Sequence, residues 1–251
     1  MRDGNLRRLL TTFLVTGAAL ISAAEAADVT KPKGVIELFT SQGCYSCPPA
    51  DKLIGKFSRD GDYLALSWHV DYWDYLGWKD TFASPKNTER QQNYARMLQE
   101  RQVYTPQAVL NGRVHEVGSR EGKIKSLFKQ LEQGDQDLSV PIDVVVDKES
   151  VNIRVAPGAV TEKATLHLVF FNKLETVKIE RGENGGKKLQ YHNVVHATQP
   201  LGLIGEDGYD MGYPTMEMAK SGFDSCALIL QTHDSDGNPS AIIGATVLSD
   251  L

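Results

Sequence analysis

In the first half of the chain, short apolar runs alternate with longer stretches whose apolar residues recur at helical spacing. The short runs are typical of buried strands, and the longer stretches are typical of amphipathic helices. Strands are predicted at 35–39, 63–70 and 107–110, and helices at 46–57, 84–102 and 121–133. Strands that alternate with helices indicate an α/β fold with parallel pairing.

The second half has a different pattern, in which β-rich segments of mostly alternating character are separated by Gly-containing turns. Strands are predicted at 140–146, 151–155, 164–171, 175–180, 188–195, 226–232 and 241–248. Many short strands at this spacing predict an all-β antiparallel sandwich. The fold class expected for the whole chain is an α/β domain over 28–135, followed by a sandwich domain over 138–251.

The N-terminal segment has the pattern of a secretory signal peptide. Arg7 and Arg8 precede an apolar run from Leu9 to Ala24, and Ala24-Glu25-Ala26 fits a small-residue cleavage site. The alternative is an uncleaved membrane anchor, but the run is shorter than the ~20 apolar residues that span a bilayer. We therefore expect cleavage after residue 26 and a periplasmic or secreted protein without a transmembrane anchor.

Charge and cysteine content narrow the function classes. The formal net charge is −5, and no cluster of Lys and Arg has the density of a nucleic-acid-binding surface. Three cysteines are too few for a disulfide-stapled scaffold. Hydrophobic cores must therefore hold the fold together, and nucleic acid is not expected as a partner.

Two of these cysteines form the motif that carries chemistry. Cys44 and Cys47 are separated by two residues, between a predicted strand and a predicted helix. The N–H groups and the dipole at a helix start favour a thiolate, so the pair is suited to redox chemistry. We expect Cys44 to lie nearer the helix end, to be the more exposed cysteine and to attack, and Cys47 to resolve the mixed disulfide.

A second feature is Thr105-Pro106, just before the third predicted strand. In the thioredoxin core, the order of elements is the same and a cis-proline at this place lies beside the cysteine pair. A cis bond here is therefore expected, with Thr105 and Pro106 presented to an extended substrate segment.

The motifs also resemble a known family. The run from Glu37 to Asp51 with Cys44 and Cys47, the aromatic run 68–78 and the segment 104–107 are similar to a secreted bacterial thioredoxin-like family of unknown function. The resemblance implies a thioredoxin-like fold for the first domain, and it implies little about activity.

Other residues are weaker candidates. Glu37 is a candidate for proton transfer, although it is one residue away from the position of the buried acid in thioredoxin. Tyr45 and Trp73 are candidates for substrate binding. The aromatic run that includes Trp73 forms either a wall of the cleft near Cys44 or a packing surface against the second domain.

No metal site is predicted. Cys226 fits a small buried residue, and the histidines of the second half lack matching ligands. These histidines are His167, His192, His196 and His233. Cu(I) bound between Cys44 and Cys47 remains an alternative, because thiolates suit that ion.

The expected function is a thiol–disulfide oxidoreductase whose redox group is the Cys44–Cys47 pair, with no dissolved cofactor. Its partners would be protein thiols or disulfides and a redox partner. The alternatives are a copper-binding or metal-handling protein and a non-catalytic binding protein.

Overall fold

The structure is a computed structural model that describes residues 28–215 and 221–249. The predicted signal peptide over 1–26 lies outside the described residues. Within them, no helix is both long enough and apolar enough to cross a membrane.

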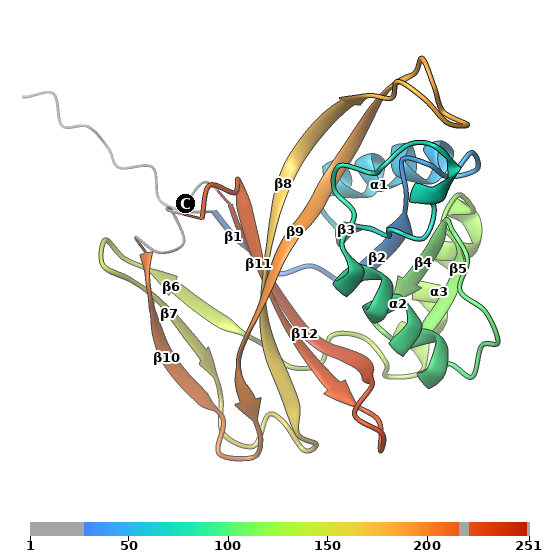
Figure 1. Cartoon of the computed structure of the whole chain (residues 1–251). Helices are drawn as coiled ribbons and strands as arrows, with labels where there is room; N and C mark the ends of the chain where they lie inside the picture. Colours follow the sequence, from blue (N-terminus) through green and yellow to red (C-terminus); the bar gives the residue numbers. More distant parts are fainter. Residues whose placement is uncertain (1–27, 216–220, 250–251) are drawn as a thin grey trace, which may run out of the picture.

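Three α-helices and a short 3-10 helix accompany two sheets in the described part of the chain (Figure 1). The helices are α1 (Pro48–Asp60), η1 (Asp74–Leu76), α2 (Pro85–Met97) and α3 (Glu121–Gln133). The strands are β1 (Asp28–Thr30), β2 (Gly34–Thr40), β3 (Tyr63–His69), β4 (Gln107–Leu110), β5 (Val114–Val117), β6 (Asp143–Val146), β7 (Ser150–Val155), β8 (Ala164–Lys178), β9 (Lys188–Ile204), β10 (Tyr209–Pro214), β11 (Ser225–His233) and β12 (Pro239–Ser249).

The predicted fold class, an α/β thioredoxin-like domain followed by a separate β-sandwich, is wrong. Strands from both halves form one mixed nine-stranded sheet, in the order β1-β12-β11-β8-β9-β3-β2-β4-β5. The join is the parallel pair of β3 and β9, at Ser67 and Val194. There, the Ser67 hydroxyl donates to the carbonyl of His192 at 2.8 Å. The physical reason is that β3 would otherwise have an unpaired edge, which β9 covers.

Three apolar clusters hold this arrangement together. One lies between α1, α3 and the β2–β4 region, and another packs the small β10-β7-β6 sheet against β8, β11 and β12. The middle cluster joins the two halves, since Phe39, Trp68 and Tyr94 share it with Phe171 and Ile229. The two halves therefore share a core as well as a sheet.

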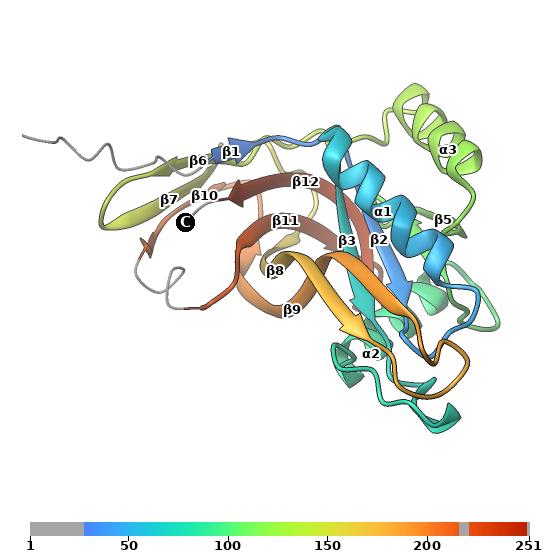
Figure 2. The same cartoon turned by 90° about the horizontal axis from the view of Figure 1, so that it is seen from above.

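The β8–β9 hairpin is longer than the sequence pattern predicts. It runs continuously through the places where separate strands at 164–171 and 175–180 were expected, with register shifts at Leu166/His167 and Phe170/Phe171. Its far end projects beyond the rest of the sheet and reaches the start of α1 (Figures 1 and 2). We call residues 179–187, which close the hairpin, the arm. The arm brings residues far apart in the sequence next to the cysteine pair.

Candidate functional site

The cysteine pair lies in the loop between β2 and α1, and it is closed as a disulfide. The Cα atoms of Cys44 and Cys47 are 5.4 Å apart. The Cys44 N–H donates to the carbonyl of Ser41 at 3.1 Å, and the Cys47 N–H donates to the carbonyl of Cys44 at 3.3 Å. The loop is therefore a tight turn whose backbone brings the two sulfur atoms together.

Helix α1 begins at Pro48, two residues later than predicted, and Cys47 is its N-cap. The expectation that Cys44 lies nearer the helix end is thus wrong. The expected difference in exposure is also nearly absent, since Cys44 is 1% exposed and Cys47 is fully buried. A thiol can reach either sulfur only if the loop moves.

The peptide bond between Thr105 and Pro106 is cis, as predicted. The Ser46 hydroxyl lies 3.5 Å from both the Cys44 sulfur and the carbonyl oxygen of Thr105. The Trp73 indole N–H donates to the Thr105 hydroxyl at 2.7 Å. These contacts bring Thr105 and Trp73 to the cysteine loop, while their predicted roles in substrate binding stay predictions.

Tyr45, the other predicted binding residue, stands between the two cysteines and is 69% exposed. The ammonium of Lys187 in the arm lies 5.1 Å from the centre of its ring. Such a cation–π contact at an exposed site contributes about 0.5–1 kcal/mol. The most exposed aromatic ring of the cysteine loop is thus partly held by the arm.

Asn184 of the arm fixes the backbone of the cysteine loop. Its side-chain amide donates to the carbonyls of Gln42 and Cys44, at 3.0 and 2.9 Å. Lys187 donates to the amide oxygen of Asn184 at 2.8 Å. Asn184 is 1% exposed, so water does not replace these bonds in the closed loop. Arm and loop therefore form one hydrogen-bonded unit.

Asn184→Leu should make the disulfide much easier to reduce. The substitution leaves two buried carbonyls without a donor, which costs about 1–3 kcal/mol in the closed loop. Because both sulfurs are buried, reduction requires the open loop, and we expect dithiothreitol to reduce the variant about tenfold faster or more. The rate is measured by quenching with an alkylating reagent and determining the mass. Lys187→Met is the matched control and should change the rate far less. An unchanged rate in Asn184→Leu would contradict the role of Asn184 in holding the cysteine loop closed.

Glu37, the predicted proton-transfer residue, lies in the middle of β2 and is fully buried. It accepts two hydrogen bonds from the Arg90 guanidinium, at 2.7 and 3.1 Å. The Tyr94 hydroxyl also donates to it, and Arg90 donates to Gln231 at 2.9 Å. Burial opposes the charge of Arg90, but Glu37 outweighs burial and raises the pKa of Arg90. Glu37 is thus linked through Arg90 to Gln231, which belongs to the second half of the chain.

A second buried acid lies much nearer the cysteine loop. Asp51 is in the first turn of α1, and its backbone N–H donates to the carbonyl of Cys47 at 3.1 Å. The Thr40 hydroxyl donates to Asp51 Oδ1 at 2.6 Å, whereas Asp51 Oδ2 is buried without a hydrogen-bond partner. Burial raises the pKa of Asp51 to about 7, even though the Thr40 bond and the charge of His69 act in the opposite direction.

Asp51 belongs to a buried polar cluster with His69, Asp80 and Tyr191. His69 Nδ1 lies 2.7 Å from Asp80 Oδ2, which also accepts the Gln42 N–H at 2.7 Å. Burial acts to raise the pKa of Asp80, but the charge and hydrogen bond of His69 outweigh it and lower the pKa. The His69 and Tyr191 rings are 4.8 Å apart between centroids. His69 Nε2 and the Tyr191 hydroxyl, like Asp51 Oδ2, are buried without a partner.

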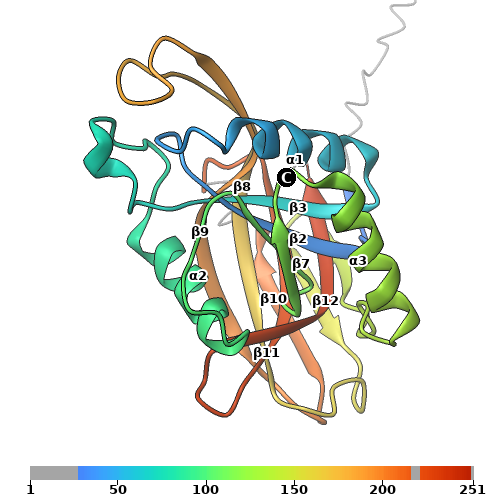
Figure 3. The same ribbon diagram turned by 90° about the vertical axis from the view of Figure 1, so that its right-hand side faces the viewer.

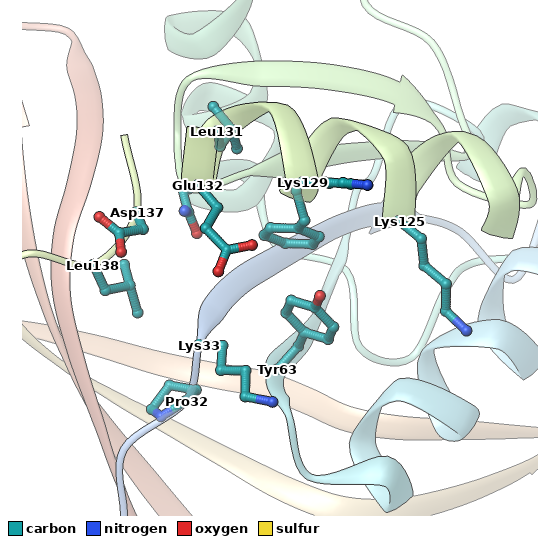
Figure 4. A pocket seen from close by; sticks show the side chains of 11 residues that line it. Pro32, Lys33, Tyr63, Lys125, Lys129, Leu131, Glu132, Asp137 and Leu138 are labelled. Atoms are coloured by element: carbon teal, nitrogen blue, oxygen red, sulfur yellow. The ribbon is translucent and has the colours of Figure 1, made fainter. Parts of the chain in front are cut away.

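A cleft of about 510 Å³ opens between α1 and β9 beside this cluster. Its walls come from the start of α1 and from the β9 strand that follows the arm. It is lined by Pro48, Asp51, Lys52, Lys188, Leu189, Gln190 and His192. A further cavity of about 440 Å³, shown in Figure 4, is lined by Lys33 before β2 and by Tyr63 at the start of β3. The cysteines follow the other end of β2, so the cavity of Figure 4 is remote from them.

Sequence reasoning missed the residues that surround the cysteine pair from outside its own motif. Asp51 carried a usable signal, because it is an acid four residues after Cys47 on a helix whose buried face includes Ile54. Asp80, Tyr191 and Asn184 carried none. Asp80 lies in the loop before α2. The positions of Tyr191 and Asn184 depend on the shared sheet and the arm, which the prediction of two separate domains did not contain. Among the described residues, no three His, Cys, Asp or Glu side chains are placed to hold a metal ion.

Comparisons with known proteins give a family and structural relatives, without an activity. A crystal structure of protein AGR_C_4864 from Agrobacterium tumefaciens is 40% identical, with a TM-score of 0.79 over 88% of this chain and 95% of that one. HBP35 of Porphyromonas gingivalis shares the fold at 14% identity, with a TM-score of 0.56 over 86% of this chain and 74% of that one. A comparison with curated proteins found no match. The family model described as "Protein of unknown function (DUF1223)" matches residues 35–231. The chain therefore belongs to the DUF1223 family of proteins of unknown function.

Proposed function

We propose that this protein is a thiol–disulfide oxidoreductase that acts through Cys44 and Cys47. The observation that carries the proposal is the disulfide between two cysteines only three residues apart, in a loop held by side chains from distant segments. A disulfide that closes so short a loop removes little entropy from the unfolded chain, so it contributes little to the stability of the fold. Burying the polar cluster of Asp51, His69, Asp80 and Tyr191 beside the disulfide costs further free energy, which a purely structural disulfide would not need.

The reaction is an exchange of two electrons between the cysteine pair and a substrate disulfide. In the reducing direction, the Cys44 thiolate attacks a substrate sulfur, the substrate S–S bond breaks, and one substrate thiolate leaves. The Cys47 thiolate then attacks the Cys44 sulfur, closes the ring and releases the second substrate thiolate. Each cysteine thiol gives up one proton and each released thiolate takes one, and the reverse sequence oxidises a dithiol.

The proposed substrate is an extended protein segment with a cysteine or disulfide. Tyr45 offers it an exposed ring beside the disulfide, and Thr105 and Trp73 form a hydrogen-bonded pair next to the loop. The proposed compartment is periplasmic or extracellular, where disulfides persist. Cys226 is not expected to take part, because burial raises the pKa of its thiol to about 12.

The proposal predicts that Cys47→Ser traps a covalent adduct. With insulin as the probe disulfide, the reduced variant should form a mixed disulfide at Cys44 and stop there, since no second thiol resolves it. Cys44→Ser is the matched control and should form no adduct in the folded protein. Adduct position is read by mass spectrometry of peptides. An adduct at Cys47 in Cys44→Ser, with none at Cys44 in Cys47→Ser, would reverse the assigned roles, and the absence of an adduct in both variants would overturn the proposed function.

A further inference from the structure

The buried cluster beside the cysteine loop contains three polar atoms that lack hydrogen-bond partners: Asp51 Oδ2, His69 Nε2 and the Tyr191 hydroxyl. Each belongs to a different element, α1, β3 and β9, and none of these side chains is used by the exchange reaction described above. Buried polar groups are normally paired, because leaving one unpaired costs about 1–3 kcal/mol. Three such atoms in one cluster indicate a polar site that serves a function.

Asp51 is the member of the cluster closest in the chain to the reacting sulfurs. It lies four residues after Cys47, so the two side chains occupy the same face of the helix start. Side chains on a helix lean toward its N-terminus, which directs the Asp51 carboxyl back toward the turn that contains Cys47. On its other side, Asp51 lines the cleft between α1 and β9. Asp51 is thus one helical turn from Cys47, and its side chain lines a cleft that is large enough for water.

The groups around Asp51 act on its carboxylate in opposite directions. Thr40 at the end of β2 donates to Oδ1, and His69 on β3 attracts the carboxylate. Asp80 repels the carboxylate, but it is itself paired with His69. Beyond the carboxyl, the charged or titratable groups lining the cleft are Lys52 of α1 and Lys188 and His192 of β9. Burial and hydrogen bonding thus hold Asp51 where it can gain or lose a proton near neutral pH.

We propose that the Asp51 carboxylate accepts the proton of the Cys47 thiol when Cys47 resolves a mixed disulfide, and passes it to the cleft between α1 and β9. This inference rests on the proposed redox function. The proton moves from Cys47 Sγ to Asp51, the Cys47 thiolate attacks the Cys44 sulfur, and the bond between Cys44 and the substrate breaks. The substrate leaves as a thiolate and takes its proton from water. In the reverse direction, the Asp51 carboxylic acid returns a proton to Cys47.

Ellman's reagent, in one equivalent, tests this step in the reduced full-length protein. The first release of the coloured thiolate reports the attack by Cys44, and the second reports resolution by Cys47. In the wild type, the rate of the second release should rise with pH as Asp51 ionises, with an inflection near the pKa of about 7. The acid form of Asp51 cannot accept a proton, so the rate is low below this pH and reaches a plateau above it.

Asp51→Asn keeps the shape of the side chain and removes the proton acceptor. We expect the second release to be about a hundredfold slower at neutral pH, with the inflection lost. The variant should approach the wild-type rate above about pH 8.5, where a cysteine thiol ionises without a base. The first release should stay unchanged. A second release with wild-type rate and pH dependence in Asp51→Asn would overturn the proposal.

Thr40→Val is a matched variant that leaves Asp51 in place. The Thr40 hydroxyl bond lowers the pKa of Asp51, so its removal should move the inflection to higher pH. An inflection that stays at the wild-type pH would contradict the assignment to Asp51. Failure of the proposed redox function has a different signature, because a reduced wild-type protein without two separate releases would show that the cysteine pair does not carry out exchange at all.

Discussion

A chain truncated after Gln133 should fail to fold, although it retains the cysteine pair and the three α-helices α1, α2 and α3. Truncation removes β9, which pairs with β3, and it removes nearly half of the middle apolar cluster. Phe39, Trp68 and Tyr94 would face water where Phe171 and Ile229 now pack. Exposing a large apolar side chain costs about 1.5–3 kcal/mol, so several of them consume the ~5–15 kcal/mol that stabilise a typical protein.

Circular dichroism and thermal unfolding of the truncated chain check this expectation. The matched control is the chain that lacks only residues 1–27, which should unfold cooperatively. If the truncated chain is soluble and unfolds in a single cooperative transition, the sheet that both halves share (Figure 3) is not needed for folding, and the two halves are independent. An aggregated or molten chain supports the continuous sheet.

The next largest effect is expected from Arg90→Gln. Arg90 on α2 is bound to the buried Glu37 of β2 and to Gln231 of β11, so it connects both halves of the chain. The variant leaves the carboxylate of Glu37 buried without its cation, which costs roughly 3–5 kcal/mol. In a protein of this size, the loss corresponds to a fall in Tm of roughly 6–20 °C.

Chemical denaturation of three variants measures this effect. Arg90→Lys keeps the charge but loses the paired hydrogen bonds, so its loss of stability should be smaller. The double variant Glu37→Leu with Arg90→Met removes both charges and should regain part of the stability lost in Arg90→Gln. A change below about 0.5 kcal/mol in Arg90→Gln, the size of an ordinary surface effect, would contradict a structural role for the pair.

The sequence was sufficient for the local elements and insufficient for their assembly. Helix α3 was predicted at its observed bounds, and the strand at 107–110 and the cis bond at Pro106 were also predicted correctly. These features depend on apolar spacing, Gly and Pro, which act over a few residues. Nothing in the pattern around Ser67 shows that its strand pairs with residue 194, because pairing across so many residues depends on the whole fold. The two-domain prediction failed at this contact.

In the candidate site, too, the residues of local motifs were predictable, and the residues from distant segments were not. Cys44, Cys47, Tyr45, Thr105 and Pro106 could be chosen from motif spacing, and Trp73 from an aromatic run after a strand. The structure places these six residues in or next to one loop. The surrounding groups were hidden, since Asn184 is 140 residues from Cys44 and reaches it only through the arm. The expected exposure of Cys44 failed for the same reason. Asn184 of the arm binds the carbonyl of Cys44, and Trp73 lies against Gly43, so distant segments contact a loop that the sequence presents as open.

Redox equilibration of the protein with glutathione distinguishes a redox-active Cys44–Cys47 pair from a structural disulfide. Mixtures of reduced and oxidised glutathione are equilibrated with the native protein, and the fraction of protein with Cys44 and Cys47 alkylated is determined by mass. A redox function predicts reversible, two-electron interconversion in the folded state, with the same endpoint from either direction and Cys226 unmodified throughout. If the disulfide is reduced only when the protein unfolds, or if the dithiol does not close again, the pair is structural and the proposed redox function is wrong.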